Sequence, residues 1–174
     1  MQVRIRNVPW RISHGLIRRC SRYVMTKFLS RQKLRHIEIE VAGEPGPFRN
    51  EGAYGFCSIS DEHYGSGKAS PVWFTIEIDT TLSMRDFLGV LCHELVHAKQ
   101  YALKQLQERY YPTYRKFWKG IDVTDRYYSQ SPFEQEAYRR EKKLYLEFTE
   151  SMHIDLEFIG PRMEKQHGSI STHN

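Results

Sequence analysis

The sequence predicts an α+β protein with an N-terminal helix, a small, mostly antiparallel sheet, and two longer helices that face each other. Three observations support this class. Apolar residues recur at helical spacing in several segments, apolar and polar residues alternate strictly in residues 72–79, and clusters rich in Gly, Pro, Asn and Ser separate the segments. The chain has 174 residues, 40% hydrophobic and 27% charged, which fits one soluble domain with its own core.

Each expected element follows from a local pattern. Strands are expected where apolar residues alternate with polar ones, at residues 2–8, 34–41, 52–60 and 72–79. Helices are expected at residues 13–31, 84–109 and 132–150, where apolar residues recur every three or four positions. Ser83 begins the second helix, Pro112 ends it, and Pro132 occupies the favoured first position of the third. We expect a single domain over residues 1–160, loops at 43–52 and 60–71, and a polar, flexible tail at 161–174.

Positive charge is concentrated at the N-terminus. Residues 1–37 contain ten Arg or Lys and no acid, whereas residues 38–174 contain the other 16 basic residues and all 21 acidic ones. A basic surface of this kind attracts nucleic acid. We therefore expect Arg18, Arg19 and Arg22, on the first helix, to bind nucleic acid weakly, although a solvated helix face explains the same pattern.

The composition also indicates the cellular environment. Cys20, Cys57 and Cys92 are odd in number, widely spaced and without a C-x-x-C pair, which is typical of reduced thiols in a cytoplasmic protein. No apolar run reaches the length of a membrane span, and no secretory signal begins the chain. The oligomeric state does not follow from the sequence.

The stretch LCHELVHAKQY, residues 91–101, carries an H-E-x-x-H motif inside the predicted second helix. His93 and His97 lie one helical turn apart, so both imidazoles leave the same face and can bind one Zn²⁺ ion. Glu94 lies beside that face, where its carboxylate can act as a general base toward water without being a ligand. The motif predicts a hydrolytic zinc site; the competing interpretation is an amphipathic helix with two ordinary histidines.

A catalytic zinc site needs a third protein ligand. The extended motif with a further Gly and His fails, because Gln100 and Leu103 occupy those positions. Glu134 and Glu136, at the start of the third helix, are acidic candidates. They point about 200 degrees apart on an ideal helix, so only one of them can ligate. The remaining candidates are histidines outside the motif, namely His14, His36, His63, His153, His167 and His173.

Three segments in order, LCHELVHAKQY, the WKG of residues 118–120 and SPFEQEAYRRE of residues 131–141, resemble small bacterial and phage zinc metallopeptidases of the gluzincin kind. The resemblance covers roughly residues 50–145 and implies a minimal zincin-like fold. It also implies that Glu134, the first Glu of the E-x-E-A segment, completes the zinc site. The strand-then-helix order is similar to SprT-like proteases, which act on proteins crosslinked to DNA. Their downstream ligand histidine is replaced here by tyrosine in YYPTYRKFW, which favours the glutamate.

The expected function is therefore that of a zinc metallopeptidase, which hydrolyses peptide bonds with metal-activated water and Glu94 as general base. The strand at residues 72–79 is expected to be an edge along which a peptide substrate adds, through Trp73, Thr75 and Glu77. Tyr138 is the candidate oxyanion donor, with Tyr127 and Tyr128 as alternatives. Two other functions compete: a nucleic-acid-associated binding module of the SprT-like type with a structural or weakly active metal site, and a hydrolase of a non-peptide bond.

Overall fold

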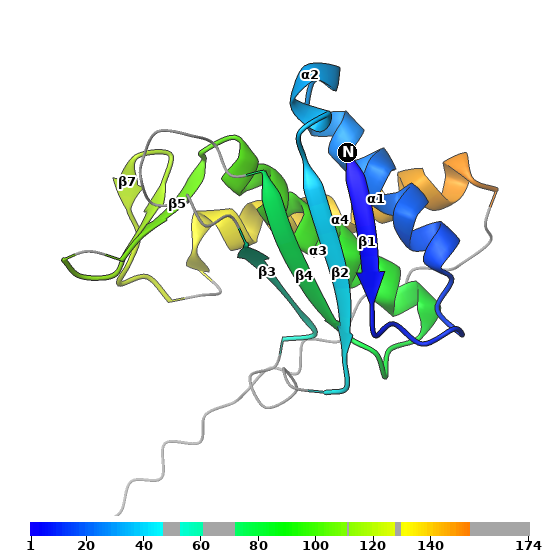
Figure 1. Cartoon of the computed structure of the whole chain (residues 1–174). Helices are drawn as coiled ribbons and strands as arrows, with labels where there is room; N and C mark the ends of the chain where they lie inside the picture. The colour runs from blue at the N-terminus through cyan, green and yellow to red at the C-terminus, as the bar shows by residue number, and fades with distance from the viewer. Residues whose placement is uncertain (47–52, 61–71, 111, 128–129, 154–174) are drawn as a thin grey trace, which may run out of the picture.

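A four-stranded mixed sheet with helices on one face forms the centre of the structure, a computed structural model (Figure 1). It describes residues 1–46, 53–60, 72–110, 112–127 and 130–153. The strands of this sheet are β1 (Gln2–Arg6), β2 (Glu38–Glu44), β3 (Gly55–Ile59) and β4 (Trp73–Asp79). The helices are α1 (His14–Phe28), α2 (Arg31–Leu34), α3 (Met84–Ala102) and α4 (Pro132–Ser151). The prediction of an α+β class is confirmed.

The strand order is β1-β2-β4-β3. β1 pairs in parallel with β2, β2 pairs in parallel with β4, and only β3 pairs antiparallel, with β4. The expected mostly antiparallel sheet is therefore wrong for these strands. The reason is the connection between β1 and β2, which contains α1: a strand, a helix and a strand in succession place the two strands side by side in the same direction.

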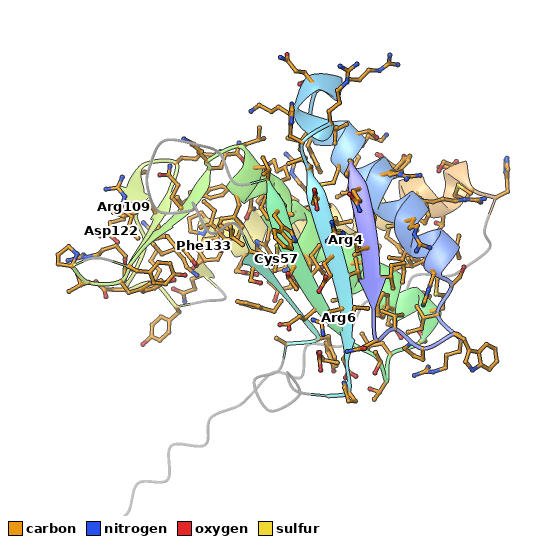
Figure 2. The ribbon with its side chains drawn as sticks, in the orientation of Figure 1. Arg4, Arg6, Cys57, Arg109, Asp122 and Phe133 are labelled. Atoms are coloured by element: carbon orange, nitrogen blue, oxygen red, sulfur yellow. The ribbon has the colours of Figure 1, made fainter. Side chains whose placement is uncertain are left out.

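The two faces of the sheet differ in polarity. Its inner face is apolar and fully buried against α1 and α3, with side chains such as Val41, Phe74 and Ile76. The outer face carries charges. Arg4 of β1 forms an ion pair with Glu38 of β2 at 3.1 Å, and Arg6 of β1 forms one with Glu40 of β2 at 2.9 Å; Figure 2 labels the two arginines. This alternation places α3 against the inner face of the sheet, where it also packs against α1 and α4.

Helix α3 is the central element. Every residue from Phe87 to Ala102 is buried, because α3 packs against the sheet, α1 and α4. Ser83 caps its first turn by accepting a hydrogen bond from the Asp86 amide at 3.1 Å, and the Cys20 and Cys92 sulfurs of α1 and α3 lie 3.6 Å apart. Polar side chains on such a helix lose their contact with water, so each needs a partner inside the protein.

Two predicted boundaries are wrong. Leu34 belongs to the short helix α2, capped by Ser30, so the strand that was expected from residue 34 starts at Glu38. The predicted helix over residues 84–109 ends at Ala102, because Lys104 adopts a left-handed conformation with φ 54°. Strands then follow, and the first of them includes residues 106–109 of the predicted helix.

These strands form a second, antiparallel sheet of β5 (Leu106–Arg109), β6 (Arg115–Trp118) and β7 (Ile121–Asp122), which lies beyond the end of α3 (Figure 1). Lys119 and Gly120 turn the chain between β6 and β7 with φ angles of 48° and 85°, the positive values that a tight hairpin turn requires. The sheet leads the chain from α3 back to the start of α4.

Some predictions fall outside the described residues. These are the tail at 161–174, residues 61–71 of one expected loop and residues 47–52 of the other. The single-domain organisation over residues 1–160 stays a prediction. Among the described helices, none has the length and apolar character needed to cross a membrane.

Candidate metal centre

His93 and His97 meet at the middle of α3. Their side chains leave the same face one turn apart, and their Nε2 atoms lie 3.1 Å from each other. Both residues are buried, at 8% and 6% exposure. The predicted helix and its spacing thus bring two imidazoles to one point inside the protein.

Glu134 in the first turn of α4 completes a three-residue group. Its two carboxylate oxygens lie 3.3 Å from the Nε2 of His93 and 3.2 Å from the Nε2 of His97, and its side chain is buried. One ligand atom from each residue lies within 4.8 Å of the others. The structure therefore brings together the three residues expected to bind a metal ion, and the group can hold one.

The alternative ligand, Glu136, faces away from this point. Its carboxylate accepts hydrogen bonds from Lys99 at 3.0 Å, from Gln100 at 3.0 Å and from Arg140 at 2.9 Å. Burial alone would raise the pKa of Glu136, but these donors outweigh burial and lower it. Glu136 is thus an ionised partner of the buried Lys99 and the exposed Arg140, on the opposite side of α4 from Glu134.

Each imidazole is also held at its other nitrogen. The Nδ1 of His93 lies 2.7 Å from the Glu141 carboxylate, and the Nδ1 of His97 lies 2.9 Å from the side-chain oxygen of Gln100. Partners of this kind orient metal-ligating histidines. Both residues were missed as functional residues from the sequence. Helical spacing contained the signal, because Glu141 follows Glu134 by two turns and Gln100 follows His97 by about one.

Glu94 lies beside the group with its side chain buried. Among the described residues its carboxylate makes no hydrogen bond or ion pair. Strand β3 covers it closely, since a Cβ atom on Gly55 would lie 3.0 Å from Oε1 of Glu94. Burial raises the pKa of Glu94, and the two histidines partly offset that rise. A carboxylate with a raised pKa accepts a proton more readily than an exposed one.

The donor set fits zinc. Two neutral imidazole nitrogens and one carboxylate oxygen are the protein ligands of many catalytic zinc sites. Burial lowers the pKa of His93, but hydrogen bonds to Glu134 and Glu141 outweigh that effect and raise the pKa to about 10. Carboxylates therefore stabilise positive charge at this point, as a cation site requires.

The candidate oxyanion donor Tyr138 lies against the group. Its ring contacts the His93 ring edge to face, with centroids 4.7 Å apart. Burial and the neighbouring carboxylates of Glu134 and Glu141 raise the pKa of its hydroxyl to about 12, so the hydroxyl keeps its proton for donation. The alternative Tyr127 is 78% exposed, and Tyr128 lies outside the described residues.

The other histidines considered as ligands do not join the group in the described structure. His14 lies 3.0 Å from the backbone oxygen of Val8, and neither His36 nor His153 belongs to a metal-binding group among the described residues. The positions of His63, His167 and His173 lie outside the described residues.

The prediction that β4 is an edge strand is wrong, because β4 pairs with β2 on one side and with β3 on the other. Trp73 contacts the guanidinium of Arg4 at 6.0 Å, and the Thr75 hydroxyl lies 2.6 Å from that of Ser60. Glu77 lies opposite Phe56 of β3. The substrate-binding role of Trp73, Thr75 and Glu77 loses its basis, since it depended on an unpaired edge.

The predicted nucleic-acid-binding arginines lie on the outer surface of α1. Arg18, Arg19 and Arg22 are exposed, and in the described part of the chain none of them forms an ion pair. Lys27, at the end of the same helix, is paired with Glu147 at 3.1 Å. The arginines are available to a partner, and binding of nucleic acid stays a prediction.

No family model matches the chain, and neither the curated proteins nor the solved structures contain a match. Function is therefore inferred from the chemistry of the site.

Proposed function

We propose that this protein is a zinc-dependent hydrolase that cleaves peptide bonds. The observation that carries the proposal is the placement of Glu94, a buried carboxylate without a hydrogen-bond partner among the described residues, beside the group of His93, His97 and Glu134. Burying a carboxylate without compensating hydrogen bonds is unfavourable. A catalytic role explains why such a carboxylate is present, because a general base has to be free to bind water and substrate.

Each residue has a defined task. His93, His97 and Glu134 would hold the zinc ion, which supplies Lewis acidity toward water and a carbonyl oxygen when bound. Glu94 accepts a proton from water and returns it to the leaving amine, and its raised pKa suits both transfers. Tyr138 keeps its hydroxyl proton and donates a hydrogen bond to the developing oxyanion.

Peptide bonds are favoured over other substrates by the order of motifs. The H-E-L-V-H segment, followed by F-E-Q-E-A at the start of α4, resembles gluzincin peptidases, and the contact between Glu134 and both histidines agrees with that resemblance. A hydrolase of a different bond would use the same zinc and base, so the substrate has to be tested directly.

The test compares zinc content with hydrolysis. We expect close to one zinc per chain by elemental mass spectrometry, and chelator-sensitive cleavage of a fluorogenic peptide library. Glu94→Gln should keep zinc while losing at least roughly a hundredfold in kcat, because an amide cannot accept the proton. Glu150→Gln, which alters an exposed carboxylate of α4, is the matched control and should leave both readouts unchanged. Loss of zinc in Glu94→Gln would contradict the assignment, because Glu94 would then be a ligand.

The second candidate is a nucleic-acid-associated binding module with a structural metal ion. Exposure of Arg18, Arg19 and Arg22, which form no ion pair with any residue that the structure describes, favours it. Glu94 counts against it, because a structural zinc site normally closes with a fourth ligand and has no use for a base. Zinc-loaded wild-type protein that cleaves no member of the peptide library would favour this candidate over the hydrolase.

A further inference from the structure

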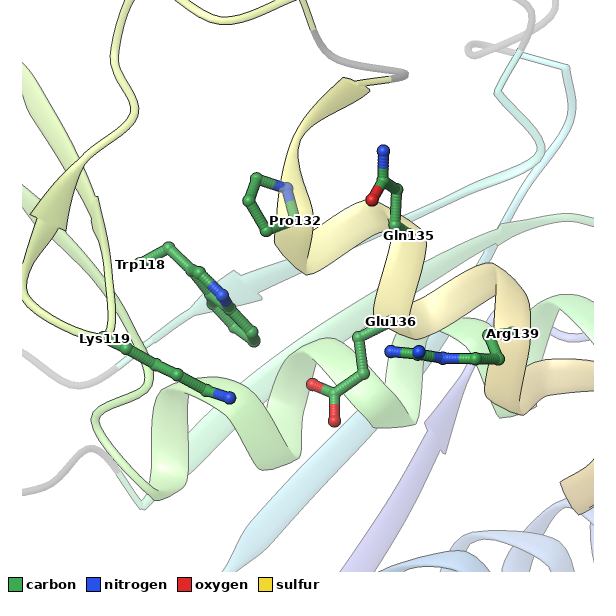
Figure 3. A pocket seen from close by; sticks show the side chains of 6 residues that line it. All are labelled: Trp118, Lys119, Pro132, Gln135, Glu136 and Arg139. Atoms are coloured by element: carbon green, nitrogen blue, oxygen red, sulfur yellow. The ribbon is translucent and has the colours of Figure 1, made fainter.

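A pocket lies between the β6–β7 turn and the first turns of α4, on the side of α4 opposite Glu134. Its volume is about 430 Å³, within the range of small-molecule sites. Its lining consists of Trp118, Lys119, Pro132, Gln135, Glu136 and Arg139. Figure 3 shows Lys119 and Arg139 reaching toward Glu136 from opposite sides. No residue of the candidate metal centre lines it.

The pocket contains more positive charge than its own residues neutralise. The single carboxylate of Glu136 is already paired with Lys99 and Arg140, at 3.0 and 2.9 Å. Lys119 and Arg139 add two further cations, and neither of them has an acidic partner among the described residues. Among the described residues, four cations around one carboxylate leave a local excess of positive charge that favours an anion.

Lys119 and Arg139 are presented by a turn and a helix. Lys119 occupies the tight turn after β6, where its amide bonds to the Gln105 oxygen at 2.6 Å, and its Nζ lies 5.0 Å from the centre of the Trp118 ring. Arg139 projects from the second turn of α4. Trp118 and Phe133 connect the two elements through a ring contact of 6.4 Å. Both cations therefore border one pocket from a turn and a helix that are already formed before a ligand arrives, which lowers the cost of ordering the backbone on binding.

We propose that this pocket binds the phosphate group of a small ligand. A lysine and an arginine that line the same pocket can bind phosphate together, because Arg presents a planar fork of hydrogen-bond donors and Lys a compact positive charge. The volume exceeds what one phosphate group fills, so the site can take a phosphate monoester as well as free phosphate. The inference does not depend on hydrolysis, since in the described part of the chain no hydrogen bond or ion pair joins Lys119 or Arg139 to the group of His93, His97 and Glu134.

Isothermal titration calorimetry at fixed ionic strength tests the proposal, with inorganic phosphate and phenyl phosphate as separate ligands of the full chain. We expect saturable binding near one ligand per chain. Lys119→Ala and Arg139→Ala should each weaken it roughly tenfold, as expected for a lost hydrogen bond to a charged group. Tighter binding of phenyl phosphate identifies an ester as the natural ligand, and equal affinity identifies free phosphate.

Lys142→Ala is the matched control, because Lys142 is an exposed cation of α4 outside the pocket; it should bind phosphate like the wild type. Lys119→Arg should retain most of the affinity, which separates loss of charge from loss of fold. Absence of saturable binding by both ligands to the wild type, or equal affinity in the Lys119→Ala, Arg139→Ala double variant and in Lys142→Ala, would overturn the proposal.

Discussion

The hydrogen bonds at the Nδ1 atoms fix the chemistry of the two histidines. A carboxylate only accepts, so Glu141 requires the proton of His93 on Nδ1 and leaves its Nε2 directed at Glu134. Glu136 likewise accepts from the Gln100 amide nitrogen, which turns the Gln100 oxygen toward the Nδ1 of His97. The Nε2 lone pairs of both histidines therefore point to the same position, and a metal ion that binds both histidines has to lie there.

The two glutamates of α4 are predicted to behave differently when replaced. Glu134→Ala should remove most of the bound zinc, because Glu134 is the carboxylate that contacts both imidazoles. Glu136→Ala should keep nearly one zinc per chain but lower the free energy of unfolding by about 1–3 kcal/mol, since Lys99 and Gln100 lose their acceptor. Elemental analysis and urea unfolding measure the two effects. Zinc loss confined to Glu136→Ala would transfer the ligand role to Glu136.

The local residue pattern and the resemblance together predicted the residues that form the group of His93, His97 and Glu134. H-E-x-x-H fixes the relative direction of His93 and His97 as soon as the segment is helical, and the choice of Glu134 used the motif order. The residues that hold the Nδ1 atoms of the two histidines could not be predicted from the local pattern. Glu141 and Gln100 become recognisable as partners only when the distance between α3 and α4 is known, because their spacing alone is shared by many ordinary helix residues.

At the scale of elements, strongly periodic segments were predicted correctly and their connections were not. The start of α3 carries a serine cap and its end carries neither Gly nor Pro, so the apolar pattern continued past Ala102 into what is β5. Strand pairing depends on which elements are brought together by long connections. The alternation of β4 therefore predicted a strand but contained no information on its two neighbours, β2 and β3.

The contact of β3 with α3 leads to a prediction at Gly55. A Cβ atom there would lie 2.6 Å from Cγ1 of Val90 and 3.0 Å from Oε1 of Glu94, so β3 or both side chains have to move. Gly55→Ala should lower the free energy of unfolding by about 1–3 kcal/mol and reduce peptide hydrolysis, while zinc content stays the same. Thermal unfolding, activity and elemental analysis check these outcomes.

Gly15→Ala is the matched control for this substitution. A Cβ atom at Gly15 meets only the Ser13 hydroxyl at 3.7 Å, an ordinary contact, and alanine in a helix is favoured over glycine by about 0.5–1 kcal/mol. The control should be neutral or slightly more stable. If Gly55→Ala leaves stability and hydrolysis as unchanged as Gly15→Ala does, close packing of β3 against Glu94 is not required for either property.

At the scale of the whole molecule, two regions of opposite charge stand out. Arg18, Arg19 and Arg22 are exposed on α1 and form no ion pair among the described residues, whereas the buried carboxylates of Glu94 and Glu134 and the part-buried carboxylate of Glu141 surround two histidines. Buried carboxylates need a cation to offset the loss of hydration. In the metal-free protein that cation is the proton on His93, whose pKa is raised to about 10. Folding, proton binding and metal binding are therefore linked.

This linkage predicts how zinc stabilises the protein at different pH values. The raised pKa means that protonated His93 contributes stability that is complete below the unfolded value of 6.5 and is lost as pH rises toward about 10. Zinc displaces that proton, so its affinity should increase by up to roughly tenfold per pH unit over the same window. The difference in Tm between zinc-loaded and chelator-treated protein should consequently grow from pH 6.5 to 8.5, which thermal unfolding at fixed zinc concentration measures.

Glu141→Gln removes one of the bonds that raise the pKa of His93, so the increase of this Tm difference with pH should be smaller in that variant. A difference that stays constant or shrinks with rising pH would show that zinc and the His93 proton do not compete.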